Sequence, residues 1–80
     1  MIDDDSEIIE NILSGDPSKY ELIIKKYQAR IIGLCYRYTK NHHDAEEVAQ
    51  ESFLRAYKSL DKFRYDSKFY SWLHRISVNC

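Results

Sequence analysis

The stretch YELIIKKYQARIIGLCYRYT, residues 20–39, decides the fold. Apolar and aromatic residues recur in it at spacings of 4, 3, 4, 3 and 4, at Tyr20, Ile24, Tyr27, Ile31, Leu34 and Tyr38, and Ile23 and Cys35 widen the stripe. Residues three and four apart share one face of a helix, so the pattern predicts a long amphipathic helix. Asp16 as N-cap and Pro17 at the first helical position place its start, and Thr39 its end.

A shorter helix is expected before it, over about residues 5–14. Its apolar residues at helical spacing are Ile8, Ile9, Ile12 and Leu13. Asp5 or Ser6 can act as its N-cap, and Gly15 stands where a glycine commonly ends a helix.

A third helix follows the break KNHHD, residues 40–44, with Asn41 or His43 as its N-cap. Its predicted buried stripe is Ala45, Ala49, Phe53, Ala56 and Leu60. Small alanine side chains permit close approach of a second helix, so an antiparallel pair with the long helix is expected.

A fourth helix is expected after a loop of about residues 61–66. Asp66 or Ser67 can cap it, Phe69, Leu73 and Ile76 would anchor it, and the apolar period is still running at Cys80. The prediction is an all-α fold, a small bundle of about four helices in one domain over residues 1–80. The interrupted last helix suggests a piece of a longer protein.

Composition excludes several classes of protein. The chain of 80 residues has no apolar run near the ~20 residues that cross a bilayer, so membrane insertion is not expected. Its acidic start lacks the features of a secretory signal, so a cytoplasmic location is expected. Cys35 and Cys80 form no CxxC pair, so neither a disulfide framework nor a zinc site is expected.

Charge is segmented although the net charge is −1. Residues 1–18, 19–40, 41–52 and 53–80 carry −6, +5, −4 and +4. The third block includes a polar face of the third helix with Glu47, Gln50, Glu51 and Leu54. This face could dock a basic helix, or it could be solvated surface that complements the helix dipole.

The stretch DKFRYDSKFYSWLHRISVN, residues 61–79, mixes five aromatic rings with five basic side chains, His74 included. One buried stripe cannot hold all the rings, so some are expected at the surface, although Phe63 and Trp72 are expected to be partly buried. Cations for phosphates and flat faces for bases are what single-stranded nucleic acid requires.

The chain resembles region 2 of a bacterial sigma factor, in the extracytoplasmic-function branch. Two stretches carry the resemblance, GDPSKYELIIKKYQARI (15–31) and DAEEVAQESFLRAYKSLDKFRYDSKFYSWLHRISVN (44–79). It implies a promoter-recognition subunit of RNA polymerase that is not an enzyme, needs no cofactor or metal, and is restrained by an anti-sigma factor. The second domain of such factors, region 4, is absent from these 80 residues.

The resemblance also implies two sets of site residues. Glu47, Gln50, Glu51, Leu54 and Tyr57 would bind the basic coiled coil of the polymerase β′ subunit. The non-template strand of the minus-ten promoter element would be opened and read by Lys62, Phe63, Arg64, Tyr65, Asp66, Ser67, Lys68, Trp72, Arg75 and Asn79. Phe63 to Ser67 would form a pocket for a flipped base, with Asn79 as a base reader. Tyr65 stands where this branch often has glycine.

Three other interpretations stay open at the level of sequence. A helix-turn-helix regulator would place the last helix in a major groove, but it needs a tight turn where an aromatic loop stands. An enzyme or metal protein would have to use His42, His43, Asp44 and Glu47, which lack an HExxH spacing. A purely structural module would require the aromatic cluster to be wholly buried.

Overall fold

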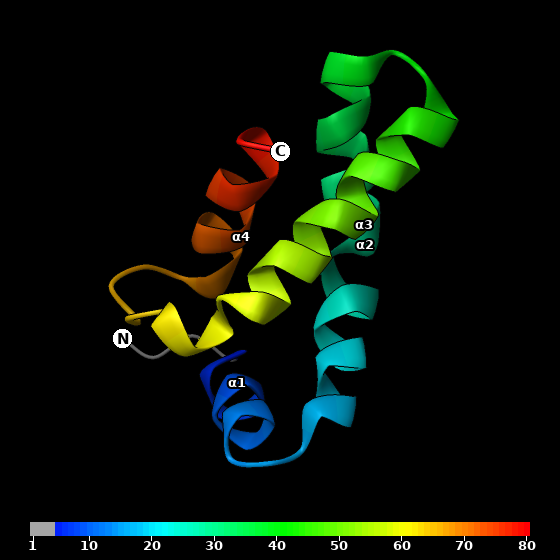
Figure 1. Ribbon diagram of the computed structural model, residues 1–80. Helices are drawn as coiled ribbons and strands as arrows, with labels where there is room; N and C mark the ends of the chain where they lie inside the picture. Colours follow the sequence, from blue (N-terminus) through cyan, green and yellow to red (C-terminus); the bar gives the residue numbers. More distant parts are fainter. Residues whose placement is uncertain (1–4) are drawn as a thin grey trace.

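The computed structural model describes residues 5–80, and the secondary structure of these residues is helical (Figure 1). Four α-helices follow in order: α1 (Asp5–Leu13), α2 (Tyr20–Thr39), α3 (His42–Lys58) and α4 (Phe69–Val78). Single 3-10 turns at Pro17–Lys19 and Leu60–Lys62 precede α2 and follow α3. The all-α prediction of about four helices is confirmed. No helix within residues 5–80 is long and apolar enough to span a membrane.

The pair α2 and α3 forms the frame of the bundle, and the two helices run in opposite directions (Figure 1). Lys40 adopts a left-handed conformation with φ 58° and turns the chain back, and the Oδ1 of Asn41 accepts a hydrogen bond from the backbone N–H of Asp44 at 3.0 Å. Asn41 is therefore the N-cap of α3, as its sequence predicts.

The core is one cluster to which all four helices contribute. Its buried residues are Ile9, Ile12, Tyr20, Ile23, Tyr27, Ile31, Cys35, Ala45, Ala49, Phe53, Ala56, Leu60, Phe63, Phe69 and Leu73. The whole predicted stripe of α3 is among them. Close approach at the alanines lets short side chains fill the space between α2 and α3.

The buried stripe of α2 differs at its end from the prediction. Tyr38 is 65% exposed and Leu34 is partly buried, whereas Ile23 and Cys35 lie in the core. Tyr36 rather than Tyr38 meets the start of α3, because its ring stacks on His42 at 4.6 Å between centroids. The buried face of α2 therefore ends at Cys35, before the chain turns into α3.

The predicted N-cap of α1 is wrong, because both candidate residues are themselves helical. Asp5 and Ser6 are buried inside α1, and the carboxylate of Asp5 accepts hydrogen bonds from Lys26 Nζ at 2.8 Å and from the Tyr27 hydroxyl. Asp16 does occupy the N-cap position, with Pro17 first in the 3-10 turn that leads into α2, but its side chain makes no cap hydrogen bond and instead accepts one from Ser18 Oγ at 2.6 Å. Gly15, at φ 122°, does end the first helical segment in a conformation that favours glycine.

The fourth helix begins later than expected. It begins at Phe69, with Lys68 rather than Asp66 or Ser67 at the N-cap. It extends to Val78.

Candidate nucleic-acid and docking surfaces

A hollow of about 300 Å³ lies between the loop that follows α3 and one flank of α4. Its lining residues are Lys62, Phe63, Arg64, Asp66, Ser67, Trp72 and Arg75. We refer to it as the loop hollow. Seven of the ten residues assigned to nucleic acid from the sequence thus come together in one place, from two separate segments of the chain.

Aromatic rings form the floor of the loop hollow. Phe63 is only 6% exposed, and its ring centroid lies 5.3 Å from that of Trp72 and 5.7 Å from that of Phe69. Trp72 is half-buried and also contacts Phe69 at 5.7 Å. Partial burial of Phe63 and Trp72 was expected, and the rings contribute to the core while keeping an edge on the hollow.

Cations surround this floor. Lys62, Arg64 and Arg75 are exposed, and within residues 5–80 none of them forms an ion pair with a carboxylate. Asp66 is the one acidic residue in the lining. The loop hollow therefore combines cations that have no ion-pair partner within residues 5–80 with the half-buried ring of Trp72, an arrangement suited to phosphates and unstacked bases.

Tyr65 lies beside the loop hollow without lining it. Its backbone is left-handed with φ 60°, a conformation that L-residues other than glycine rarely adopt. Its ring packs on Phe63 at 4.8 Å between centroids, and Tyr65 is 44% exposed. Burial, and then the negative charge of Glu10 in α1, raise the pKa of the Tyr65 phenol. Tyr65 thus packs the loop against the bundle.

Lys68 and Asn79 are likewise outside the lining of the loop hollow. Lys68 is the exposed N-cap of α4. Asn79 lines a separate depression of about 520 Å³ on the side of α3, with Glu51, Arg55, Lys58, Ser59 and Ile76. A strand that reached both places would have to run along one flank of α4.

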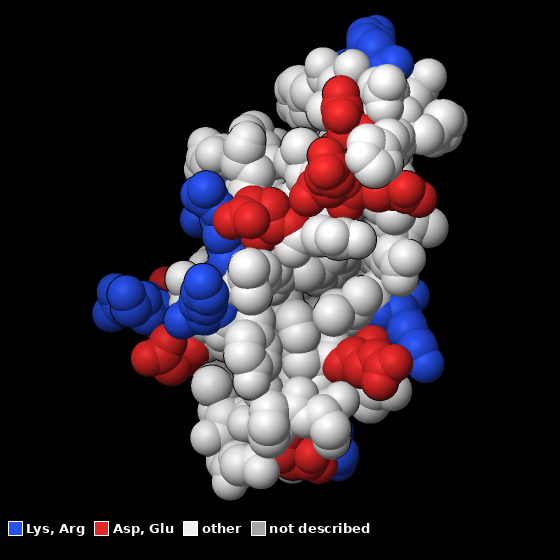
Figure 2. All heavy atoms as spheres, turned by 45° about the vertical axis from the view of Figure 1, so that its right-hand side comes forward, with Lys and Arg blue, Asp and Glu red and all other residues white. Residues whose placement is uncertain are grey.

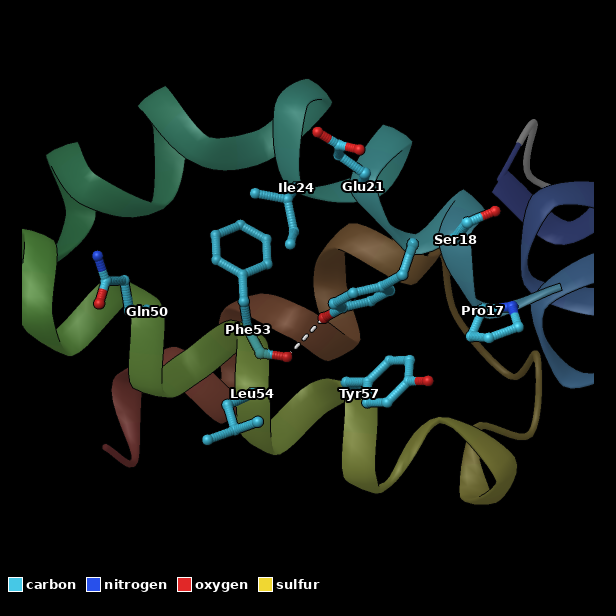
Figure 3. Close-up of a pocket in the computed structure, with 9 residues that line it drawn as sticks. Pro17, Ser18, Glu21, Ile24, Gln50, Phe53, Leu54 and Tyr57 are labelled. Atoms are coloured by element: carbon cyan, nitrogen blue, oxygen red, sulfur yellow. Dashed lines mark hydrogen bonds between the residues drawn. The ribbon is translucent and has the colours of Figure 1, made fainter.

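A second feature, which the sequence did not reveal, is an apolar groove of about 520 Å³ between α2 and α3 (Figure 3). Its lining residues are Pro17, Ser18, Tyr20, Glu21, Ile24, Gln50, Phe53, Leu54 and Tyr57. We refer to it as the α2–α3 groove. Its presence depends on how two helices cross, and the one hint in the sequence is an apolar residue, Leu54, on a polar face.

Tyr20 holds the two sides of this groove together. Its buried hydroxyl donates a hydrogen bond of 2.6 Å to the backbone carbonyl of Phe53, shown as a dashed line in Figure 3, and its ring lies 4.9 Å from that of Tyr57. Burial strongly raises the pKa of the Tyr20 phenol, which therefore stays neutral. Both walls of the groove are therefore α-helices, and the Tyr20 hydrogen bond joins them.

The predicted docking face of α3 divides into two parts at this groove. Gln50, Leu54 and Tyr57 line it, and the last two are 47% and 40% exposed. Glu47 and Glu51 lie outside it on the exposed surface, where they pair with His43 at 3.7 Å and with Arg55 at 3.1 Å. Figure 2 shows a band of acidic side chains across the upper part of this face, above uncharged surface. An apolar groove bordered by acids suits a basic, amphipathic helix.

The residues of the metal hypothesis are engaged differently. His42 stacks on Tyr36, and His43 reaches the carboxylate of Glu47 one turn along α3. Within residues 5–80, no three His, Cys, Asp or Glu side chains are grouped so that they could hold a metal ion.

A helical bundle with a cation-rimmed aromatic hollow and a separate apolar groove has the features expected of a nucleic-acid-binding module. Comparisons with known proteins agree with this class. The chain belongs to the Sigma-70 region 2 family, whose sequence model matches residues 23–80.

Relatives and a solved structure support the assignment. The chain is 43% identical to the RNA polymerase sigma-H factor of Pseudomonas aeruginosa and 41% identical to the ECF RNA polymerase sigma-E factor of Haemophilus influenzae, each over 75 residues and 94% of this chain. It spans only 39% of the length of each relative. The fold is similar, with a TM-score of 0.85 and 37% identity, to an engineered region 2 of sigmaE solved by NMR in complex with GTAAAA, covering 94% of this chain and 78% of that one.

Proposed function

We propose that this chain is the promoter-recognition module, region 2, of a bacterial RNA polymerase sigma factor of the extracytoplasmic-function type. The observation that carries the proposal is the loop hollow, in which seven residues of a sigma-like loop and helix combine an aromatic floor with cations that have no ion-pair partner within residues 5–80. The proposed role is binding rather than bond chemistry, and it is carried by one domain over residues 1–80.

In this proposal the loop hollow receives a base flipped out of the minus-ten element on the non-template strand. Extracting a base from a duplex costs a few kcal/mol, and stacking on an aromatic ring returns about 1–3 kcal/mol per base. Trp72 would supply the ring, on a floor that the buried Phe63 supports, and Arg64 and Arg75 would supply the charges. The amide of Asn79 would read a base further along the flank.

The second half of the proposal is that the α2–α3 groove and the acids beside it bind the basic coiled coil of the polymerase β′ subunit. Leu54 and Tyr57 would take apolar side chains of that coil. Glu47 and Glu51 would meet its cations after exchanging their present exposed partners, at little cost because such pairs contribute about 0–1 kcal/mol.

Location and regulation follow from the same role. Sigma factors act on RNA polymerase in the cytoplasm, and we propose that location for this chain. We also propose that an anti-sigma factor restrains it, which would require covering either the loop hollow or the α2–α3 groove.

The helix-turn-helix interpretation has less support. Residues 63–68 separate the turn Leu60–Lys62 from α4, so the last two helices are joined by an aromatic loop rather than by a tight turn. A purely structural role needs a sealed cluster, whereas Tyr65 is 44% exposed and Arg64 is exposed.

Binding to melted and to paired DNA tests the proposal. We expect the purified chain to bind a labelled GTAAAA hexanucleotide, measured by fluorescence anisotropy, more tightly than a duplex of the same sequence. The double variant Arg64→Ala, Tyr65→Ala should lose most of this binding, while Lys25→Ala, a change at an exposed cation of α2, should not. Tighter binding to the duplex would favour the helix-turn-helix alternative. A set of hexanucleotides varied one base at a time should be included, because Tyr65 replaces the glycine common in this branch.

A further inference from the structure

The side of α2 that adjoins α4 carries a second set of cations and rings. Lys26, Arg30 and Arg37 follow at spacings of four and seven residues, so they share one face of α2. The guanidinium carbon of Arg30 lies 3.9 Å from the ring centroid of Tyr70 in α4. This is a close cation–π contact that joins the two helices at the surface.

The contact extends on both sides of Arg30. The Tyr70 ring lies 6.0 Å from that of His74, one turn along α4, and 5.1 Å from that of Tyr27 in α2. Lys26 Nζ lies 5.3 Å from the Tyr27 centroid. We refer to Lys26, Tyr27, Arg30, Tyr70 and His74 as the α2–α4 platform. Within the platform Tyr27 is buried, Tyr70 and His74 are half-buried, and Arg30 is exposed.

The two permanent cations of the platform, Lys26 and Arg30, differ in how they are paired. Among residues 5–80 the one carboxylate that pairs with a platform cation is Asp5, which is bound to Lys26 at 2.8 Å. Arg30 has no ion-pair partner in the same part of the chain. Stacking on Tyr70 fixes the plane of the guanidinium, and its N–H groups remain available to a bidentate anion such as a phosphate.

The platform lies on the opposite flank of α4 from the loop hollow. Tyr70 and His74 are on one side of the helix, and Trp72 and Arg75, which line the hollow, are on the other. An α-helix with its side chains is about 10–12 Å wide, a distance that a few nucleotides of single strand cover. The two cation–aromatic sets are therefore within reach of one strand that crosses α4.

We propose that the α2–α4 platform binds the phosphate backbone of the same DNA strand that the loop hollow grips, outside the segment held in the hollow. The inference rests on the proposed function and extends it. Nucleic acid is favoured over an acidic protein because the platform combines cations with stacked rings and shares α4 with the hollow. Arg30 is the central phosphate ligand.

Strand length provides the test. Labelled GTAAAA is compared with two twelve-nucleotide strands that carry six thymidines on its 5′ or its 3′ side. We expect one extended strand to bind the wild-type chain more tightly than the hexanucleotide. Arg30→Gln should reduce affinity for that strand about fivefold and lower the slope of log affinity against log salt by about 0.7, the value for one phosphate on a single strand. Binding of the hexanucleotide should not change.

Two variants provide the controls. Lys25→Gln removes the same charge from an exposed side chain paired with Glu21, and should leave all three strands unaffected. Arg30→Lys should keep most of the salt slope, because it retains the cation. Thermal melting by circular dichroism checks that each variant is folded.

Three outcomes would overturn the inference. The first is equal affinity of wild type and Arg30→Gln for both extended strands at low salt. The second is an equal loss with Lys25→Gln, which would reduce Arg30 to general electrostatics. The third is that Arg30→Gln loses affinity for an acidic peptide, poly-glutamate, while its affinity for the DNA strands is unchanged. That result would assign the platform to a protein partner. Failure of the wild-type chain to bind the hexanucleotide would instead count against the proposed function itself.

Discussion

The α2–α3 groove and the loop hollow lie on one small bundle, but they are built in different ways. The groove lies between two long helices whose backbones are internally paired and whose walls are joined by the Tyr20 to Phe53 hydrogen bond. Much of the hollow is formed by a segment without regular structure, residues 63–68, in which Tyr65 adopts a left-handed conformation. The shape of the groove is set by two packed helices, whereas the shape of the hollow depends on the conformation of a loop.

This difference determines what substitutions should do. In the groove, exposed side chains can be exchanged without consequence for the fold, so partner affinity and stability separate cleanly. In the hollow, Phe63 is at once a core residue and part of the floor, and removing it would alter stability and binding together. Informative variants there must change the loop without emptying the core.

The largest expected effect is on the groove side. The double variant Gln50→Ala, Glu51→Lys places a cation where a basic partner would dock, so affinity for the polymerase β′ coiled coil should fall tenfold or more. The fold should be unaffected, because only the exposed Glu51–Arg55 pair is lost, a contribution of about 0–1 kcal/mol. Surface plasmon resonance with immobilised polymerase core measures the affinity.

Glu7→Lys is the matched control for this variant, since it reverses one charge on the exposed surface of α1. It should bind polymerase like the wild-type chain. Unchanged polymerase affinity in the double variant would count against the groove as the docking site.

The same contrast explains which features could be predicted from the sequence. The cap Asn41 and the alanine stripe of α3 are local signals, because a side chain three residues from its target or a helical period suffices to specify them. The cap expected at Asp5 failed for a tertiary reason, because its carboxylate is buried against Lys26 and Tyr27. The N-cap of α4 is Lys68 rather than Asp66 or Ser67.

The site followed the same rule. The resemblance to sigma region 2 named the residues of the loop hollow, but the α2–α3 groove could not be foreseen, because Ile24 and Leu54 become neighbours only when two helices cross. Tyr65 was expected in the pocket. Its position on Phe63, directed toward α1, depends on a backbone conformation that residue type alone would not suggest.

A smaller effect is expected on the hollow side, from Tyr65. Tyr65→Gly relieves a left-handed conformation that costs roughly 1–2 kcal/mol, but it loses ring packing on Phe63 worth about 0.5–1.5 kcal/mol and frees the loop. Stability should therefore change by less than about 1 kcal/mol, while affinity for GTAAAA falls severalfold because the loop is less ordered. Tyr65→Phe keeps the ring and should bind like the wild-type chain.

Anisotropy titrations and urea unfolding of both variants measure these quantities. If Tyr65 only positions the loop, Tyr65→Gly should weaken binding of every base-substituted hexanucleotide by the same factor. A loss confined to one base at one position would mean that the Tyr65 side chain contacts that base, and the loop would then differ less from the groove than proposed here.

The smallest effect concerns Tyr27, which lies beneath the α4 side of the bundle and away from the groove. Burial, followed by its hydrogen bond to Asp5, raises the pKa of the Tyr27 phenol to about 12, from the usual 10. The folded state therefore favours the neutral phenol. That stabilisation is complete below pH 10 and is lost as the pH rises through about 12, so the free energy of unfolding should decline in this window.

In Tyr27→Phe the decline of the unfolding free energy with pH should be shallower, by on the order of 1 kcal/mol. Tyr38→Phe, at a tyrosine that is 65% exposed, should match the wild-type slope. Urea midpoints at pH 9, 10, 11 and 12 give the three curves. Identical slopes for wild type and Tyr27→Phe would show that the link from α1 through Asp5 to Tyr27 does not stabilise the side of the bundle that carries α4.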